Sequence, residues 1–155
     1  MPVPALNSLI EDANLQYRVT KSDAVNGTVI VSGVTAAGKN KSAITIPDTV
    51  VKNNYTFKVT AIDKNVFKVC KKKLKSVIIG ANVTDIGANS FTKCNKLKSI
   101  RFMGKTAPKK VGKNAFKGIK ATCKIFYPKS MSKSELKKLK KKMKSAGKKV
   151  KYKKK

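Results

Sequence analysis

Histidine is missing from this chain of 155 residues, and acidic side chains are scarce, with seven Asp and Glu against 37 Lys and Arg. Without histidine, the chain lacks the usual general base, the commonest metal ligand and the ordinary pH switch. Its three cysteines are an odd number without a Cys-x-x-Cys spacing, which argues against a disulfide framework and against a zinc site. We therefore predict that the protein is not an enzyme and that it holds neither a metal nor a cofactor.

Long apolar runs are also missing. No stretch approaches the roughly 18 consecutive apolar residues that a membrane-spanning helix requires. The opening segment, residues 1–17, lacks the basic start and the apolar core of a signal peptide. From the sequence we expect either an intracellular protein or a mature fragment from which a signal has been removed.

The basic residues give a formal charge of +30 and are unevenly placed along the chain. Residues 1–50 carry four basic and four acidic groups, residues 51–128 carry 19 and two, and residues 129–155 carry 14 and one. A field of this sign attracts polyanions such as nucleic acid, acidic glycans, teichoic acids or anionic membrane surfaces. The alternative interpretation is a solvated lysine surface without a partner, and charge alone does not separate the two.

A repeat of about two dozen residues is the most informative feature that the chain does contain. Two clear copies, VTAIDKNVFKVCKKKLKSVII and VTDIGANSFTKCNKLKSIRF, begin at Val59 and Val83, and a weaker copy, VGKNAFKGIKATCKIFY, begins at Val111. A fixed period of this length indicates stacked repeats, each of which buries its apolar face against its neighbours. The sequence therefore predicts a single domain, residues 1–155, with a β-rich solenoid fold.

Each copy contains one predicted strand with the spacing L-x-x-I-x-F. The side chains expected to point inward from it are Leu74, Val77, Ile79, Leu97, Ile100 and Phe102. The segment 42–46 resembles a modified first repeat, in which Ile44 and Ile46 stand where Val77 and Ile79 stand.

Two recurring residue types mark the turns between strands. An asparagine precedes each repeat phenylalanine by two positions, at Asn65, Asn89 and Asn114, and we expect it to bond backbone groups as in an Asx-turn. Cys70 and Cys94 occupy equivalent places and are expected to be buried apolar residues, because parallel Cβ vectors suit a disulfide poorly. The third cysteine, at position 123, is expected near the surface of the last repeat.

The segment 1–41 is predicted to be a lead-in followed by a β-hairpin cap. Residues 1–14 read as irregular, residues 15–20 as a strand, and Asn26-Gly27 as the tight turn with positive φ that starts the return strand. A second hairpin is expected at Asn53-Asn54, within the repeats, which we place at residues 42–128.

Residues 129–155 are predicted to form a lysine-rich helical cap. Ser132 and Glu135 form a capping box, and Gly147 ends the helix. The apolar stripe expected to cover the last repeat consists of Leu136, Leu139 and Met143. Val150 and Tyr152 suggest a short final strand, and the last five residues are expected to fray.

The repeats resemble the BspA-type leucine-rich repeat of bacterial surface proteins, whose pattern is roughly V-T-x-I-G-x-x-A-F-x-x-C-x-x-L-x-x-I-x-I. The resemblance covers about residues 15–152, with Asp63 in place of the glycine, and Ile119 and Thr122 at the Cys and Leu positions of the third copy. It implies a short right-handed solenoid that is extracellular or at the cell surface and serves adhesion or protein binding.

The outward side chains of the strands are the candidate ligand-binding surface. Stacking aligns Thr45, Ile78, Arg101 and Phe126 in one row, beside Ser76, Ser99 and Lys124 in a second. Aromatic and arginine anchors are typical of binding hot spots. We expect a host or bacterial surface protein, or an acidic glycan, as partner. The alternatives are cover by a cap or a neighbouring domain, and scattered apolar surface residues.

A candidate anion-binding row lies on the return side of the repeats, at Lys68, Lys93 and Lys117. Three aligned ammonium groups suit sulfate, phosphate or carboxylate, although solvated lysines would show the same spacing. The alternative function is a non-specific binder of nucleic acid or of another anionic polymer such as teichoic acid. With two arginines in the chain, a sequence-specific reader is disfavoured, because bidentate base contacts prefer arginine.

Overall fold

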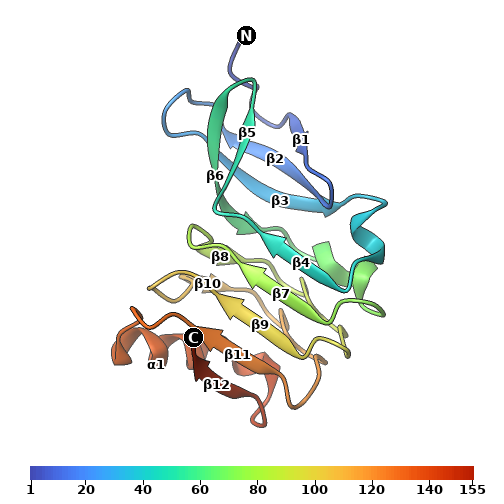
Figure 1. The fold of residues 1–155 in the computed structure, drawn as a ribbon, viewed down its shortest axis with the longest axis vertical. Helices are drawn as coiled ribbons and strands as arrows, with labels where there is room; N and C mark the ends of the chain where they lie inside the picture. Colours follow the sequence, from blue (N-terminus) through green and yellow to red (C-terminus); the bar gives the residue numbers. More distant parts are fainter.

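The computed structural model describes all 155 residues and shows a mostly parallel β fold with one C-terminal helix. A seven-stranded sheet has the strand order β1-β2-β3-β6-β8-β10, with β5 also paired to β6 (Figure 1). Its strands are β1 Leu9–Glu11, β2 Leu15–Lys21, β3 Thr28–Val34, β5 Thr49–Lys52, β6 Tyr55–Ile62, β8 Asp85–Ile86 and β10 Lys110–Val111.

The second sheet contains five parallel strands in the order β12-β11-β9-β7-β4. Its strands are β4 Ala43–Ile46, β7 Ser76–Ile79, β9 Ser99–Phe102, β11 Lys124–Tyr127 and β12 Lys151–Lys154. The register pairs Ile44 with Val77, Val77 with Ile100, and Ile100 with Ile125, which confirms the predicted alignment of the repeats.

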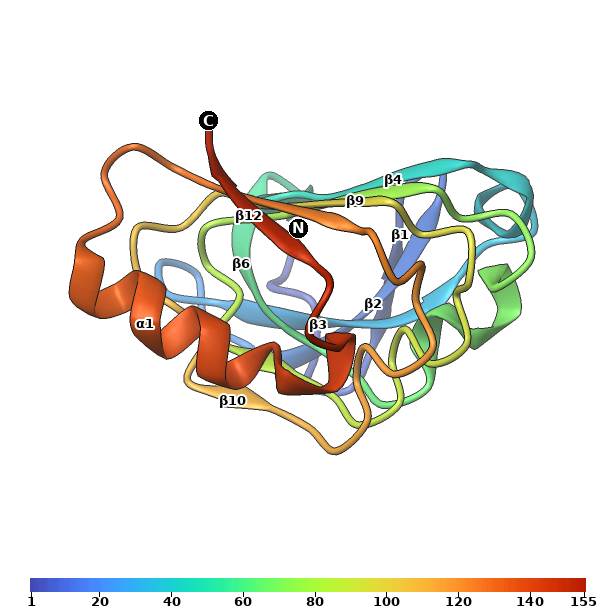
Figure 2. The same cartoon turned by 90° about the horizontal axis from the view of Figure 1, so that it is seen from below.

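The core lies between the two sheets, as the view along the stack shows (Figure 2). One cluster of 34 buried apolar residues runs through the molecule and contains all six predicted inward side chains. Each repeat crosses from the five-stranded sheet to the opposite sheet and back, so the chain supplies one layer of this core per repeat. Burial of apolar area on this scale is the main favourable term in folding.

A stack of phenylalanine rings supports the return side of the core. Phe67 and Phe91 lie 4.7 Å apart between ring centroids, and Phe91 and Phe116 lie 5.1 Å apart, with interplanar angles of 9° and 7°. All three rings have no exposed surface. The repeat therefore places a phenylalanine ring at the equivalent position of three successive layers, where the rings stack on one another.

Close contact between neighbouring repeats also requires glycine at one position. A Cβ added to Gly112 would collide with the backbone nitrogen of Ala88, and one added to Gly87 would collide with that of Lys64. Asp63 occupies the same position in the first copy, and its carboxylate accepts a hydrogen bond from the Lys64 N–H at 2.8 Å.

The repeated asparagines differ from the prediction. Asn65, Asn89 and Asn114 have φ angles of 65°, 58° and 58°, in the left-handed region that asparagine tolerates better than other non-glycine residues. The Asn65 side chain caps no backbone group. The expected Asx-turn is therefore wrong here, and backbone conformation explains the asparagine instead.

The N-terminal hairpin forms between β2 and β3 as predicted, but its turn is built differently. Neither Asn26 nor Gly27 has a positive φ. The Asp23 carboxylate instead accepts hydrogen bonds from the N–H groups of Val25 and Asn26, both at 2.8 Å. The second hairpin is confirmed, with φ angles of 54° and 66° at Asn53 and Asn54.

One segment expected to be irregular is a strand, and the short final strand suggested by Val150 and Tyr152 is present. β1 lies within the lead-in and pairs antiparallel with β2. β12 confirms the predicted final strand, takes up four of the five C-terminal residues and pairs in parallel with β11, so the fraying expected for the same residues is wrong. Cys123 is buried rather than near the surface, because β12 lies beyond β11 and the Lys151 N–H donates to the Cys123 carbonyl at 3.0 Å.

The C-terminal helix α1, Lys133–Lys142, is joined to the loop after β9 by a side chain of its first turn. The Ser132 hydroxyl accepts from the Glu135 N–H at 3.1 Å, as a capping residue does. Glu135 does not complete the predicted capping box. Its carboxylate accepts from the Ala107 N–H at 3.0 Å and pairs with Lys138 at 2.9 Å.

The middle of the ring stack should be a sensitive point for stability. Phe91→Ala is expected to lower the free energy of unfolding by about 3–5 kcal/mol, because it removes a fully buried ring packed on both faces. Met103→Ala, at a side chain with 42% exposure, should cost less than about 0.5 kcal/mol. Urea unfolding followed by circular dichroism measures both, and similar losses in the two variants would contradict the role given to the stack.

Substitutions of Asn65 separate backbone conformation from side-chain bonding. Asn65→Ala should lower the free energy of unfolding by about 1 kcal/mol, because alanine resists the left-handed conformation. Asn65→Gly should leave it almost unchanged, because glycine adopts that conformation readily. Equal losses in the two variants, again by urea unfolding, would point to a lost side-chain bond and against this explanation.

Candidate binding surface

The five-stranded sheet brings the predicted outward residues together in two rows. Residues directly paired across the strands form the first row, which consists of Thr45, Ile78, Arg101, Phe126 and Lys153. The second row consists of Ala43, Ser76, Ser99, Lys124 and Lys151. Neighbouring strands in a sheet are about 4.8 Å apart, so each row presents closely spaced side chains along one face.

The sequence prediction missed the lysines that extend both rows. Lys151 and Lys153 belong to β12, the short final strand that the sequence suggested, but neither lysine was included in the predicted rows. The alternation of Val150 and Tyr152 with lysine was the available signal for this strand. What the sequence did not reveal is that β12 pairs with β11, because no repeat pattern reaches that far.

The Phe126 ring is partly covered by a cation from the C-terminus. The Lys155 ammonium lies 4.7 Å from the ring centroid, a contact worth about 0.5–1 kcal/mol at an exposed site. A shallow cavity of about 440 Å³ opens beside the ring, with Ser99 and Lys124 in its lining. The further lining residues that the prediction missed are Lys98, Lys120, Thr122 and Lys155.

The charge of this face rises from β4 towards β12. The outward residues of β4 are Ala43 and Thr45, whereas those of β12 are Lys151 and Lys153. Arg101, in the middle, takes part in no intramolecular ion pair, because the two ion pairs of the chain join Arg18 to Asp63 and Lys138 to Glu135. The Arg101 guanidinium is therefore available to an acidic group outside the chain.

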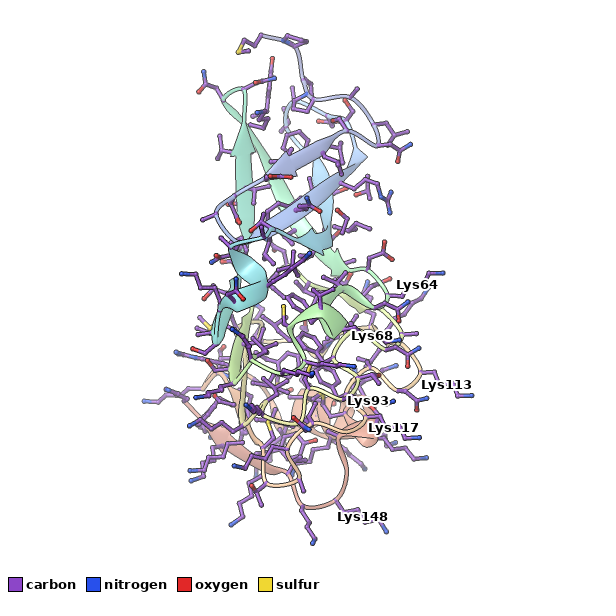
Figure 3. The ribbon with its side chains drawn as sticks, turned by 90° about the vertical axis from the view of Figure 1, so that its right-hand side faces the viewer. Lys64, Lys68, Lys93, Lys113, Lys117 and Lys148 are labelled. Atoms are coloured by element: carbon purple, nitrogen blue, oxygen red, sulfur yellow. The ribbon has the colours of Figure 1, made fainter.

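The candidate anion-binding lysines follow one another down the return side (Figure 3). The Lys93 N–H donates to the Lys117 carbonyl at 2.8 Å. Lys93 has a φ of 62° and packs against Gly118. It comes two residues after its repeat phenylalanine, whereas Lys68 and Lys117 come one residue after theirs, so the three are not at equivalent positions as predicted. Of the three, Lys117 also lines a cavity beneath α1.

The cysteines are unsuited to nucleophilic chemistry. All three are buried and free of disulfides, and burial raises the pKa of the Cys94 and Cys123 thiols to about 12. The Cys94 thiol donates to the Phe67 carbonyl at 3.6 Å inside the core. Since a thiolate is the reactive form, these side chains serve as apolar core residues.

Two further features follow from the whole structure. No three side chains of the metal-binding types His, Cys, Asp and Glu come together in one place. The chain also contains no helix that is both long enough and apolar enough to cross a membrane.

Comparison with known proteins agrees with this architecture. Residues 60–144 match a family described as a BspA type leucine rich repeat region with six copies. Since the match covers more than half of the chain, the protein belongs to the BspA-type leucine-rich repeat family. A comparison with curated protein sequences finds no match.

Three crystal structures share the fold at low sequence identity. A leucine rich cell surface protein from Faecalibacterium prausnitzii A2-165 has a TM-score of 0.59 and 23% identity, over 81% of this chain and 38% of its own length. A leucine-rich repeat protein from Bacteroides capillosus has a TM-score of 0.64 and 18% identity, over 94% of this chain and 99% of its own length. A leucine-rich repeat protein from Bacteroides ovatus has a TM-score of 0.52 and 21% identity, over 79% of this chain and 38% of its own length. Against the first and third structures, this chain therefore spans little more than a third of the length.

Thiol labelling tests the placement of the cysteines. At pH 8 we expect no modification of Cys70, Cys94 or Cys123 in the folded protein during the time in which the urea-unfolded chain reacts completely. Labelling of Cys94 and Cys123 should stay slow at pH 9, because their thiols remain protonated up to a pKa of about 12, against an ordinary value of 9.0. Mass spectrometry assigns each site, and rapid labelling of Cys123 alone would contradict its burial beneath β12.

Proposed function

We propose that this chain is a non-enzymatic interaction module that binds a protein or an acidic glycan through the face of β4, β7, β9, β11 and β12. The observation that carries the proposal is the row in which Ile78, Arg101 and Phe126 lie on adjacent strands of one parallel sheet. It combines an aliphatic, a cationic and an aromatic side chain at consecutive positions.

The chemistry of this row resembles that of a binding hot spot. Tyr, Trp and Arg dominate hot spots, and a buried aromatic or arginine anchor surrounded by weaker contacts gives most of the affinity. Ile78, Arg101 and Phe126 are half-buried, so their surroundings hold them in place while one side stays open. Ordering such side chains on binding costs less than ordering fully mobile ones.

Charge complementarity favours an acidic partner. Lys124, Lys151 and Lys153 surround the C-terminal half of both rows without a carboxylate beside them. A partner with an acidic surface would associate faster through this field, and its own charges would fix the orientation of the complex. A host or bacterial surface protein, or an acidic glycan, meets this requirement.

We further infer that the stacked repeats form a short right-handed solenoid, and that the protein acts outside the cell or at its surface. Membership of the BspA-type family supports both inferences, and one structural relative is described as a cell surface protein. Repeat proteins of this kind offer extended faces for binding, which agrees with the site proposed on the five-stranded sheet.

A paired substitution tests the proposed face. An array of bacterial and host surface proteins and acidic glycans, probed at physiological salt, first identifies a partner. Arg101→Glu with Phe126→Ala should then weaken its binding at least about a hundredfold, because each anchor is worth roughly 2 kcal/mol. Isothermal titration calorimetry measures the change, and circular dichroism confirms that the variant is folded.

A matched control separates this face from total charge. Lys58→Glu with Val51→Ala makes the same change of charge and truncates an apolar side chain at exposed positions of the seven-stranded sheet. The control should retain binding within about threefold, since rim-type contacts carry little affinity. Full binding by the Arg101 and Phe126 variant, or equal loss in both variants, would refute the site assignment.

A further inference from the structure

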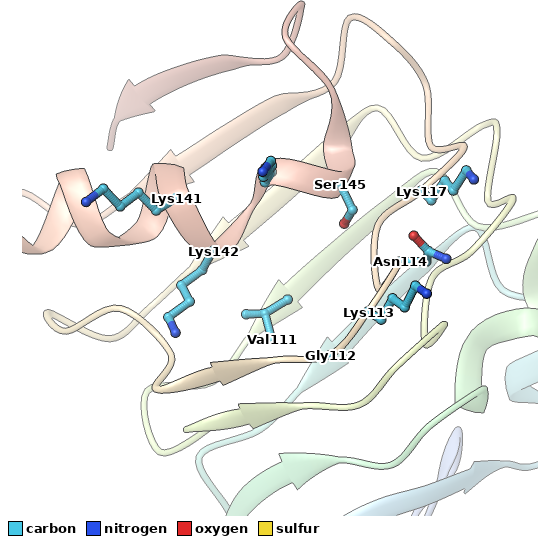
Figure 4. A pocket seen from close by; sticks show the side chains of 9 residues that line it. Val111, Gly112, Lys113, Asn114, Lys117, Lys141, Lys142 and Ser145 are labelled. Carbon is cyan, nitrogen blue, oxygen red and sulfur yellow. The ribbon is translucent and has the colours of Figure 1, made fainter.

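A second cavity lies between α1 and the last repeat, on the side of β10 and away from the five-stranded sheet (Figures 2 and 4). Its volume is about 530 Å³. Five lysines line it, from the last turn of the repeats and from the C-terminal helical segment: Lys113, Lys117, Lys141, Lys142 and Lys144. No acidic side chain belongs to its lining.

An unused backbone donor faces the end of the stack at this cavity. On the return side, the Asn65 N–H donates to the Ala88 carbonyl and the Asn89 N–H donates to the Lys113 carbonyl, each at 3.1 Å. Asn114 occupies the same position in the last repeat. No repeat follows it, and its N–H has no acceptor within the protein.

The neighbouring donor shows that an oxygen can take the place of the missing repeat. The Phe91 N–H donates to the Ala115 carbonyl at 2.8 Å, whereas the equivalent Phe116 N–H donates to the Ser145 hydroxyl at 3.1 Å. Ser145 lies in the short 3-10 helix Lys144–Ala146 that follows α1. Its hydroxyl accepts this bond and donates none within the protein, so its proton is free for another acceptor.

The cavity therefore contains donors and positive charge but no charged acceptor. Figure 4 shows Ser145 facing Asn114, with Lys113 and Lys117 near the repeat and Lys141 and Lys142 near the helix. Glu135 is the one acidic residue after position 85, and it is occupied by Lys138 and the Ala107 N–H at the other end of α1.

We propose that this cavity binds a ligand that carries two or more phosphate groups close together. A phosphate oxygen would accept from the Asn114 N–H in place of the absent carbonyl, and other oxygens would accept from the Ser145 hydroxyl and the lysines. Donors on opposite walls suit a tetrahedral anion better than a planar carboxylate, and lysine binds phosphate as a point charge.

The size and composition of the cavity restrict the range of suitable ligands further. A volume of about 530 Å³ equals that of roughly 18 water molecules at about 30 Å³ each, which exceeds the volume of one phosphate ion. Neither an aromatic residue nor an arginine lines it, so it offers no platform on which a nucleic-acid base could stack. Recognition therefore rests on the phosphate groups themselves.

Tripolyphosphate is a suitable probe for this site. In 150 mM salt, Lys117→Gln with Lys144→Gln should weaken tripolyphosphate binding at least about tenfold, because charged hydrogen bonds to both walls are lost. Lys96→Gln with Lys105→Gln removes the same charge at exposed positions outside the cavity and should change binding less than about twofold. Calorimetry measures the tripolyphosphate affinity of the unaltered protein and of the two variants. All four substituted lysines are exposed, so we expect both variants to fold.

Amide NMR gives a second, local readout. Tripolyphosphate should shift the Asn114 N–H signal saturably, while the Asn89 N–H, already bonded to the Lys113 carbonyl, should move little. Equal weakening in both lysine variants, or an unmoved Asn114 signal, would show attraction by total charge only and would overturn the proposal. Equally tight binding of sulfate would overturn the preference for linked phosphate groups.

The result of the tripolyphosphate experiment does not depend on the site proposed on the five-stranded sheet. The Arg101→Glu and Phe126→Ala variant should bind tripolyphosphate within about threefold of the unaltered protein, because neither residue lines this cavity. Failure of the phosphate site would therefore leave the function proposed for the sheet untouched, and the reverse also holds.

Discussion

Backbone hydrogen bonds between successive repeats hold β4, β7, β9 and β11 in one parallel register, and the rest of the structure depends on this pairing. Once the register is set, equivalent side chains must lie above one another. Apolar residues then form continuous columns, of which the Phe67, Phe91 and Phe116 rings are the clearest example. The same geometry lines up the outward residues, so the candidate binding row arises from the pairing that builds the core.

A stack of repeats has two ends, and a different structural element covers each of them. At the first end, the hairpin of β2 and β3 adds strands to the seven-stranded sheet. At the second end, α1 replaces a further repeat, and side chains substitute for backbone groups, as Ser145 does for the Phe116 N–H. The substitution is incomplete at Asn114, because a helix lacks carbonyls at the spacing of a strand ladder. Closure by a helix thus explains the unused donor at this end.

The period of the repeat made the inward and outward residues predictable, because equivalent positions in successive copies have equivalent surroundings. Within the repeats, the role of the asparagines was mispredicted, and most other failures lie outside them. The sequence suggested β12, but not its pairing with β11, which places Lys153 in the first row. Cys123 is buried because β12 lies beyond β11, a pairing that the repeat pattern does not reveal. The donor at Asn114 has no sequence signature, since it results from the absence of a following repeat.

The lysines are all exposed, both in the repeats and in the C-terminal segment that follows them. Repulsion among them is weakened by water and salt, which keeps their cost to folding low. Their summed field attracts any polyanion to the C-terminal half of the molecule and has no strong preference among them. Selection must therefore come from local geometry. In the two proposals it comes from Arg101 beside Phe126 on the sheet, and beneath α1 from the Asn114 N–H and the Ser145 hydroxyl, donors that suit a tetrahedral anion better than a planar one.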